Sequence, residues 1–244
     1  MAHQRLTLHV SIPFFRMLIL ASFTSCTFFV SPAMAGGEAG YKSGAAGKEV
    51  LVFNGKDFSG WTFFLEDPKL KLEDVWSVKP KEGIIVCKGK PNGYIRTVKD
   101  YTNFILKFQW RWSPVTKQAG NSGALLRVTG ADKIWPRMVE AQLMSGQAGD
   151  FWLIDGKRLV TAPERQGDKG EGYDHRKRIK GAEKPVGEWN QYEILCDGDR
   201  IALKINGELV NEGTGADVEP GKISLQSEGA EIHFRNIRLT PLGK

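Results

Sequence analysis

The segment Phe104–Trp112 constrains the fold most strongly, because apolar and polar residues alternate along its whole length. Aromatic or aliphatic residues occupy every second position, and Lys107, Gln109 and Arg111 stand between them. Successive side chains of a β-strand point to opposite faces, so the pattern predicts a strand with one buried and one polar face. Segments 123–128 and 138–144 alternate in the same way.

The C-terminal third has the pattern of consecutive hairpins. Two turn dipeptides, Asp197-Gly198 and Asn206-Gly207, separate short apolar segments. Such pairs supply the positive φ angles that two-residue hairpin turns require. No segment shows a long apolar period of about 3.6 residues, which argues against helical and α/β folds. The sequence therefore predicts an all-β sandwich of two antiparallel sheets.

Residues 156–188 interrupt this pattern. They are rich in Gly, Lys and Glu, include Pro163 and Pro185, and contain at most a short hairpin. A loop of this length inside one domain is often functional. A plain surface excursion is the alternative.

The first 35 residues have the pattern of a secretory signal peptide. A basic start with Arg5 and Arg16 precedes a short apolar run and the small-residue site Ala33-Met34-Ala35. A membrane span needs about 20 apolar residues, so we expect cleavage after Ala35, export to the periplasm or the extracellular space, and no span in the mature chain. An uncleaved anchor is the alternative. The composition of residues 36–48 predicts a flexible linker. We expect residues 49–244 to form one domain.

Charge and cysteine content exclude several classes of protein. The net charge is +6, but the basic residues are scattered, so no nucleic-acid partner is expected. Cys87 and Cys196 lie on predicted strands and either form a disulfide or remain as buried thiols. No zinc-protease, serine-hydrolase or phosphate-loop motif occurs.

Polar residues on strand faces are the candidates for a binding surface. Arg111, Arg127, Glu140 and Gln142 alternate with apolar residues on three predicted strands. If these strands are neighbours, guanidinium and carboxylate groups grip sugar hydroxyls on a polar concave face. The alternative is ordinary solvent exposure. Trp152 either stacks on a sugar ring or packs in the core, and the same choice holds for Trp135.

Several segments, taken together, resemble one family. Residues 51–61 (LVFNGKDFSGW) resemble the opening of the 3-keto-disaccharide hydrolase domain family. Asn121-Ser122-Gly123 with Arg127, Glu140-x-Gln142, the G-E-W-N segment at 187–190, and the final segments at 221–226 and 234–237 match its later motifs in order. The resemblance covers about residues 50–242 and implies a concanavalin A-like jelly roll that acts on 3-keto-glycosides.

The resemblance also implies site residues. A ketone at carbon 3 acidifies the proton on carbon 2, so one base and one charge stabiliser suffice for elimination, with hydration to follow. Glu140 is the expected base and Arg127 the expected stabiliser. Six residues are expected to bind substrate: Asn121, Gln142, Arg111, Trp152, Gln226 and Glu228. Many relatives have His at the position of Glu228.

Three points stay open at this stage. Glu, Asn and Gln oxygens suit a divalent cation such as Ca²⁺ or Mn²⁺, so a metal is a possible cofactor. A non-catalytic carbohydrate-binding module is the alternative function, and a sandwich used for protein contact is a third. The sequence assigns no oligomeric state.

Overall fold

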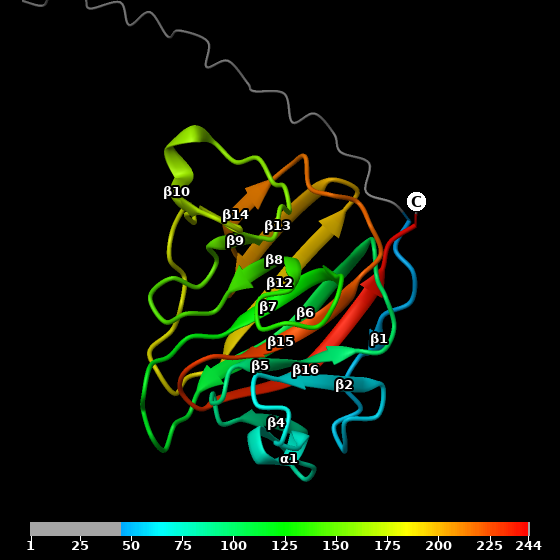
Figure 1. The fold of residues 1–244 in the computed structure, drawn as a ribbon, viewed down its shortest axis with the longest axis vertical. Coiled ribbons are helices and arrows are strands. Elements are labelled where there is room, and N and C mark those ends of the chain that lie inside the picture. Colours follow the sequence, from blue (N-terminus) through cyan, green and yellow to red (C-terminus); the bar gives the residue numbers. More distant parts are fainter. Residues whose placement is uncertain (1–44, 244) are drawn as a thin grey trace, which may run out of the picture. The chain divides into compact units, whose positions relative to one another are not determined.

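Two antiparallel sheets form the fold of residues 45–243, the part of the chain that the computed structural model describes (Figure 1). The first, here called the β6 sheet, has the strand order β14 (Glu208–Gly213), β13 (Arg200–Ile205), β12 (Asn190–Asp197), β6 (Phe104–Trp112), β16 (Ile232–Pro241), β4 (Ile84–Cys87) and β3 (Trp76–Lys79), with β1 (Val50–Leu51) also paired to β16. The second, the β8 sheet, has the order β10 (Gln166–Gly170), β11 (Tyr173–Arg176), β9 (Phe151–Ile154), β8 (Arg137–Gln142), β7 (Gly123–Thr129), β15 (Lys222–Ser227), β5 (Gly93–Thr97) and β2 (Trp61–Leu65). The helices α1 (Leu72–Val75) and η1 (Pro163–Arg165) are short.

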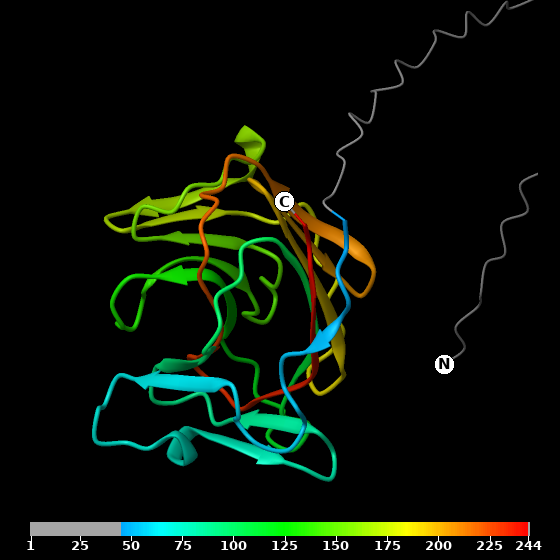
Figure 2. The same ribbon diagram turned by 90° about the vertical axis from the view of Figure 1, so that its right-hand side faces the viewer.

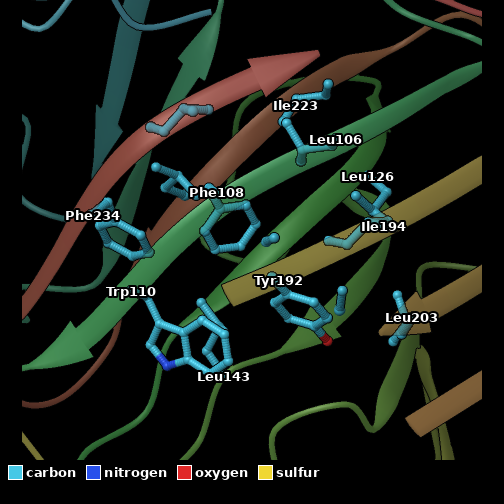
Figure 3. Packing of buried hydrophobic residues seen from close by; sticks show 14 of the residues in the cluster. Leu106, Phe108, Trp110, Leu126, Leu143, Tyr192, Ile194, Leu203, Ile223 and Phe234 are labelled. Carbon is cyan, nitrogen blue, oxygen red and sulfur yellow. The ribbon is translucent and has the colours of Figure 1, made fainter. Parts of the chain in front are cut away.

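The alternation in residues 104–112 becomes strand β6 with the predicted boundaries. Phe108 and Trp110 are buried between the sheets and pack against Tyr192 and Phe234, as Figure 3 shows. Burying a large apolar side chain contributes roughly 1.5–3 kcal/mol. The predicted all-β sandwich is therefore confirmed, and its core lies where the sequence pattern requires it.

The β8 sheet also sends alternate residues inward. Leu126, Val139, Ala141 and Phe151 pack in the core between the sheets. The residues between them point to the outer face. Seen edge-on, this sheet curves so that its outer face is concave (Figure 2). That concave face is the surface on which neighbouring strands can gather polar side chains.

The segment 156–188 contains one short hairpin, in agreement with the expectation of at most one. Strand β11 pairs with β9, so the β10–β11 hairpin extends the β8 sheet at one edge. Its turn residues, Glu171 and Gly172, reach the concave face. The hairpin thus contributes to the cavity described below.

Cys87 and Cys196 are free, buried thiols. They lie on β4 and β12, two strands of one sheet that are separated by β16 and β6. Burial raises the pKa of each thiol to about 12. Of the two alternatives, a disulfide or two buried thiols, the structure therefore shows two buried thiols.

The N-terminal predictions lie mostly outside the described residues. This holds for the signal peptide and for residues 36–44. Residues 45–48 are described, and there Gly47 N donates a 2.7 Å hydrogen bond to Pro241 O while Ala46 bridges to Leu242. Ordered pairing with the C-terminal strand therefore begins before residue 49. Within residues 45–243, no helix has the length and apolar character needed to cross a bilayer.

Candidate functional site

A cavity of about 380 Å³ opens on the concave face of the β8 sheet. Strands β8 and β9 form its floor, and the loops before β7 and after β15 form one wall. The β10–β11 turn and the loop before β8 form the other side. The lining residues are Asn121, Trp135, Glu140, Gln142, Met144, Trp152, Ile154, Glu171, Gly172, Tyr173 and Glu228.

Strand register explains why the polar groups converge. Glu140 on β8 pairs with Trp152 on the neighbouring strand β9, so these two side chains share one face. Gln142, two residues after Glu140, points to the same face and pairs with Gly123 on β7. Asn121 forms an isolated bridge with Glu228, which brings the loop before β7 against the end of β15. Residues far apart in sequence therefore meet over a few strands.

Glu140 has a buried carboxyl group with few polar contacts to offset the loss of water. Its side chain is 5 % exposed, and its Oε1 has no hydrogen-bond partner within residues 45–243. Its carboxyl group lies over Gly123, where any Cβ would overlap it. Burial, followed by the negative charge of Glu228, raises the pKa of Glu140 well above its ordinary value. Glu140 therefore favours its protonated form.

Glu228 is half-buried and ionises more readily. Partial burial raises its pKa to about 7, while a hydrogen bond from Asn121 opposes that rise. Both glutamates line the cavity, but Glu140 is almost fully buried, whereas Glu228 is half-buried beside the Asn121 amide. Carboxyl pairs whose pKa values differ in this way are common among catalytic acids and bases.

Several buried polar atoms in and beside the cavity lack partners. Gln226 is 1 % exposed, and both its Nε2 and Oε1 are unpaired within the described part of the chain. Asn121 Oδ1 and Trp152 Nε1 are also unpaired there. Each such group costs about 1–3 kcal/mol when buried. Unpaired donors and acceptors around a cavity favour a polar ligand that satisfies them.

Trp152 is held by a chain of contacts that ends at an ion pair. Its ring stacks on His175 at 4.3 Å between centroids, with 10° between the planes. His175 Nε2 lies 2.8 Å from Asp150 Oδ2, and Asp150 Oδ1 accepts from Arg178. Although burial opposes its ionisation, hydrogen bonds from His175 and Arg178 keep the pKa of Asp150 below its usual value. Trp152 is therefore a fixed aromatic surface on the floor of the cavity.

Gln142 lies beside Trp152 on the floor of the cavity, and its side-chain oxygen is already hydrogen-bonded. Its Oε1 accepts hydrogen bonds from the backbone N–H groups of Leu143 and Met144 at 2.8 and 2.9 Å. The amide nitrogen is thereby turned away from those groups. Gln142 can orient a ligand as a donor.

Arg127 does not share the polar face, contrary to the prediction. Its side chain is 1 % exposed and donates to the carbonyl oxygens of Thr102, Asp217 and Gly198, each within 2.9 Å. Those partners lie at the end of the β6 sheet and in the loop after β14. A register shift in β7 after Leu126, with a left-handed φ of 48° at Arg127, breaks the alternation. The structure gives this arginine an interior bridging position.

Arg111 also lies away from the cavity. It is on β6, and its guanidinium stacks over Trp189 at 4.4 Å on the outer face of the other sheet. Arg235 stacks on the same ring at 4.0 Å. The prediction that Arg111 and Glu140 share one surface is wrong, because β6 and β8 belong to different sheets. Alternation along a strand shows which residues share a face of that strand, but it does not show which sheet the strand joins.

The remaining predicted residues are brought together. Asn121, Glu140, Gln142, Trp152 and Glu228 line one cavity, and Gln226 lies beside it on β15. Sequence reasoning missed a further set whose signal is visible only through pairing: Met144, Ile154, Glu171, Tyr173 and His175. Asp150 was considered from the sequence as a possible second carboxylate of a classical glycosidase pair, and the structure has it bonded to His175 and Arg178. Within residues 45–243 no group of three or more His, Cys, Asp or Glu side chains forms a metal cluster. The oxygen ligands that line the cavity are the carboxyl groups of Glu140, Glu171 and Glu228, with the Asn121 and Gln142 amides.

Known proteins resemble this chain across the sandwich. Residues 48–240 match the model of the 3-keto-alpha-glucoside-1,2-lyase-like domain. A 3-keto-disaccharide hydrolase of Bacteroides thetaiotaomicron is 23% identical, over 79% of this chain and 78% of that protein. A proposed glycosyl hydrolase of Parabacteroides distasonis is 23% identical with a TM-score of 0.57, covering 80% of this chain and 100% of that chain.

A more distant structure has the same fold. It is a β-1,3-1,4-glucanase (lichenase) from a mouse hindgut metagenome, 12% identical, with a TM-score of 0.51 over 80% of this chain and 99% of that chain. The sandwich is a concanavalin A-like jelly roll, as the sequence resemblance implied. The match to the domain model over nearly all of the described residues shows that the chain belongs to the 3-keto-alpha-glucoside-1,2-lyase-like family.

Proposed function

We propose that this protein hydrolyses 3-keto-glycosides by elimination and hydration at the cavity of Glu140 and Glu228. The observation that supports this most is the pair of carboxyl groups with raised pKa values in one cavity. Membership of the family supports the same reaction class, since the relative from Bacteroides thetaiotaomicron is a 3-keto-disaccharide hydrolase.

The reaction needs one base and one group that stabilises the developing negative charge. In the first step the Glu228 carboxylate takes the proton from carbon 2, and the C–H electrons form an enediolate with the carbon 3 ketone. In the second step the enediolate electrons form the C1–C2 double bond and expel the oxygen on carbon 1. That oxygen receives the proton from Glu228, so the leaving group departs as an alcohol.

Hydration reverses the sequence with water. Glu228 takes a proton from water, the hydroxide oxygen bonds to carbon 1, and carbon 2 is reprotonated. The sum is hydrolysis of the glycosidic bond without an acid–base pair of the ordinary glycosidase type. This proposal moves the base from Glu140 to Glu228, because Glu228 is the carboxyl group that ionises near neutral pH.

Glu140 serves as a neutral hydrogen-bond donor to the developing charge on the carbon 3 oxygen. A buried carboxyl group that keeps its proton can stabilise an enediolate in this way. This role replaces the one expected for Arg127, whose guanidinium is occupied elsewhere. Asn121, Gln142 and Gln226 supply amide groups for the sugar hydroxyls, and Trp152 provides an aromatic surface.

The direct test is incubation of purified protein with a 3-keto-glucoside, with and without a chelator. We expect release of the aglycone and a 3-keto-sugar product. Activity lost to the chelator and restored by Ca²⁺ or Mn²⁺ would assign a cation to the oxygen ligands of the cavity. Binding of plain glycans with no turnover of any 3-keto substrate would instead favour a carbohydrate-binding module.

Gly123→Ala is expected to lower activity by displacing Glu140. A Cβ at this position would overlap Oε1, Cδ and Cγ of Glu140, so the carboxyl group must move off its site. We expect a loss of about 10²-fold in kcat, since small misplacements of a catalytic group are costly. Steady-state kinetics and circular dichroism together check this. Gly181→Ala is the control, because Gly181 has no left-handed φ and its Cβ would meet nothing closer than 3.6 Å. Equal kinetics in the two variants would contradict the prediction.

Glu228→Gln is expected to change the pH dependence of stability. The folded-state pKa of Glu228, about 7, lies above the ordinary value of 4.5, so the folded protein holds this proton more tightly. Its contribution to stability is full below about pH 4.5 and is lost as the pH rises through 7. The variant should therefore gain in melting temperature relative to the parent between pH 4.5 and 7, with a constant difference above. A difference that is flat across this range would show an ordinary pKa.

Export is part of the same proposal. The basic start, short apolar run and Ala33-Met34-Ala35 site support cleavage after Ala35 and a periplasmic or extracellular enzyme. N-terminal sequencing of the protein from the exported fraction tests it. A mature chain that begins at Gly36 is expected.

A further inference from the structure

A second cavity adjoins the first on the concave face. It has a volume of about 600 Å³ and shares four lining residues with the first, namely Trp135, Ile154, Glu171 and Gly172. It extends over Phe64 and Glu66 at the β2 edge of the sheet. The two cavities therefore form one continuous groove, with the Glu140–Glu228 pair at one end only.

The second cavity has an apolar floor toward β2. There Phe64 and Ile154 pack on a cluster of Tyr94, Leu125, Val128 and Met138. Phe64 and Tyr94 stack at 5.6 Å with 28° between their rings. A ligand part that lies here needs an apolar face.

The rim of the second cavity is acidic. Its lining contains Glu66, Asp132, Asp155 and Glu171 but only one basic residue, Lys133. Asp155 is paired with Lys133 at 2.8 Å, and Asp132 is held by Arg96 from outside the lining. Glu66 and Glu171 have no ion pair within residues 45–243. The local charge that a ligand meets is therefore negative.

We infer that the second cavity binds the leaving group of the glycoside and selects uncharged groups with an apolar face over anionic ones. The inference rests on the proposed function, because it places the reacting sugar at Glu140 and Glu228. A substituent on carbon 1 must extend from that sugar, and the continuous groove offers it space beyond Trp135. Carboxylates beside this space repel a carboxylate or phosphate on the leaving group.

A matched pair of substrates tests the charge selection. The 4-carbamoylphenyl and 4-carboxyphenyl 3-keto-glucosides have similar shape, and only the second is anionic. We expect kcat/KM to be about 3–10-fold higher for the carbamoyl substrate at low salt, with the ratio falling at about 0.5 M salt as the charges are screened. The double variant Glu66→Gln/Glu171→Gln should bring the ratio close to 1. Glu193→Gln, on the β6 sheet, is the matched carboxylate control and should leave it unchanged.

A second variant tests the apolar floor. Phe64→Ala should raise KM for the aryl substrates about 5–20-fold, the effect of losing part of one buried aromatic contact. It should leave KM for methyl 3-keto-glucoside unchanged, because a methyl group does not reach Phe64. Equal effects of Phe64→Ala on the aryl and methyl substrates would show a structural role for Phe64. A kcat/KM ratio of 1 between the carbamoyl and carboxyl substrates in the parent protein would overturn the inference.

Failure of the proposed function has a separate signature. If the parent protein cleaves neither aryl substrate, the reaction assignment is wrong. Equilibrium titration with the ordinary, unoxidised 4-carbamoylphenyl and 4-carboxyphenyl glucosides then decides the inference by itself. Tighter binding of the uncharged glucoside, lost in the Glu66→Gln/Glu171→Gln variant, supports it, and equal binding overturns it.

Discussion

Replacing Glu228 by Gln is expected to lower kcat on a 3-keto-glucoside by about 10²–10⁴-fold, the usual contribution of a general base. The amide keeps the size of the side chain and can still meet Asn121, but it cannot accept the carbon 2 proton. Activity of the parent protein should rise with pH through about 7, as the carboxyl group ionises. A pH–rate profile of kcat/KM for both proteins checks the loss and its cause.

Two further variants make this result specific. Glu228→His supplies a different base and should restore part of the activity, with a rising limb near the ordinary histidine pKa of about 6.5. Glu193→Gln changes a carboxylate on the outer face of the other sheet and should have the parent profile. Full activity in Glu228→Gln would remove this residue from the mechanism and return the base role to Glu140.

Replacing Arg127 by Ala is expected to destabilise the fold by about 3–5 kcal/mol, because it removes a buried side chain and leaves three partly buried carbonyl oxygens without their donor, each at a cost of about 1–3 kcal/mol. In a domain of this size the melting temperature should fall by about 10 °C. The folded fraction should retain the KM of the parent protein, since Arg127 lies outside the cavity. Thermal unfolding and kinetics at a temperature below the transition check both parts.

Arg111→Ala is the matched control for this prediction. It removes an arginine from a half-buried stack on Trp189, where Arg235 still covers the ring. A cation–π contact of this kind contributes about 0.5–1 kcal/mol, so the fall should be only about 1–4 °C. A large rise in KM for Arg127→Ala with unchanged stability would instead return that residue to the substrate site.

Alternation predicted the fold well where strand pairing is regular. Strand β6 has the predicted ends, and its apolar residues are the centre of the core. The Asn206-Gly207 turn lies between β13 and β14 as expected. The turn between β12 and β13 is Gly198-Asp199, one residue later than predicted, because Asp197 still pairs with Arg200. The alternation of apolar residues and the residue types of tight turns are local properties. They can therefore be recognised in a sequence even when the pairing of the strands is unknown.

The candidate site was predicted less completely, for reasons that Arg127 and Arg111 illustrate. The register shift in β7 turns Arg127 from the concave face into the interior. The residue types in that segment do not predict a β-bulge. Arg111 has the correct face of its strand but belongs to the other sheet. Trp135 and Tyr173 enter the cavity from loops and an edge hairpin, whose place depends on long-range pairing.

The division of the groove has a consequence for how such enzymes diversify. The carboxyl pair lies on and beside the central strands β8 and β15, whereas Phe64 and Glu171 belong to opposite edges of the same sheet. Edge strands and turns share few contacts with the central strands, and substitutions at distant sites act nearly independently on stability. Under the proposed function, selection can therefore alter the preferred leaving group at the edges of the sheet while Glu140 and Glu228 stay unchanged.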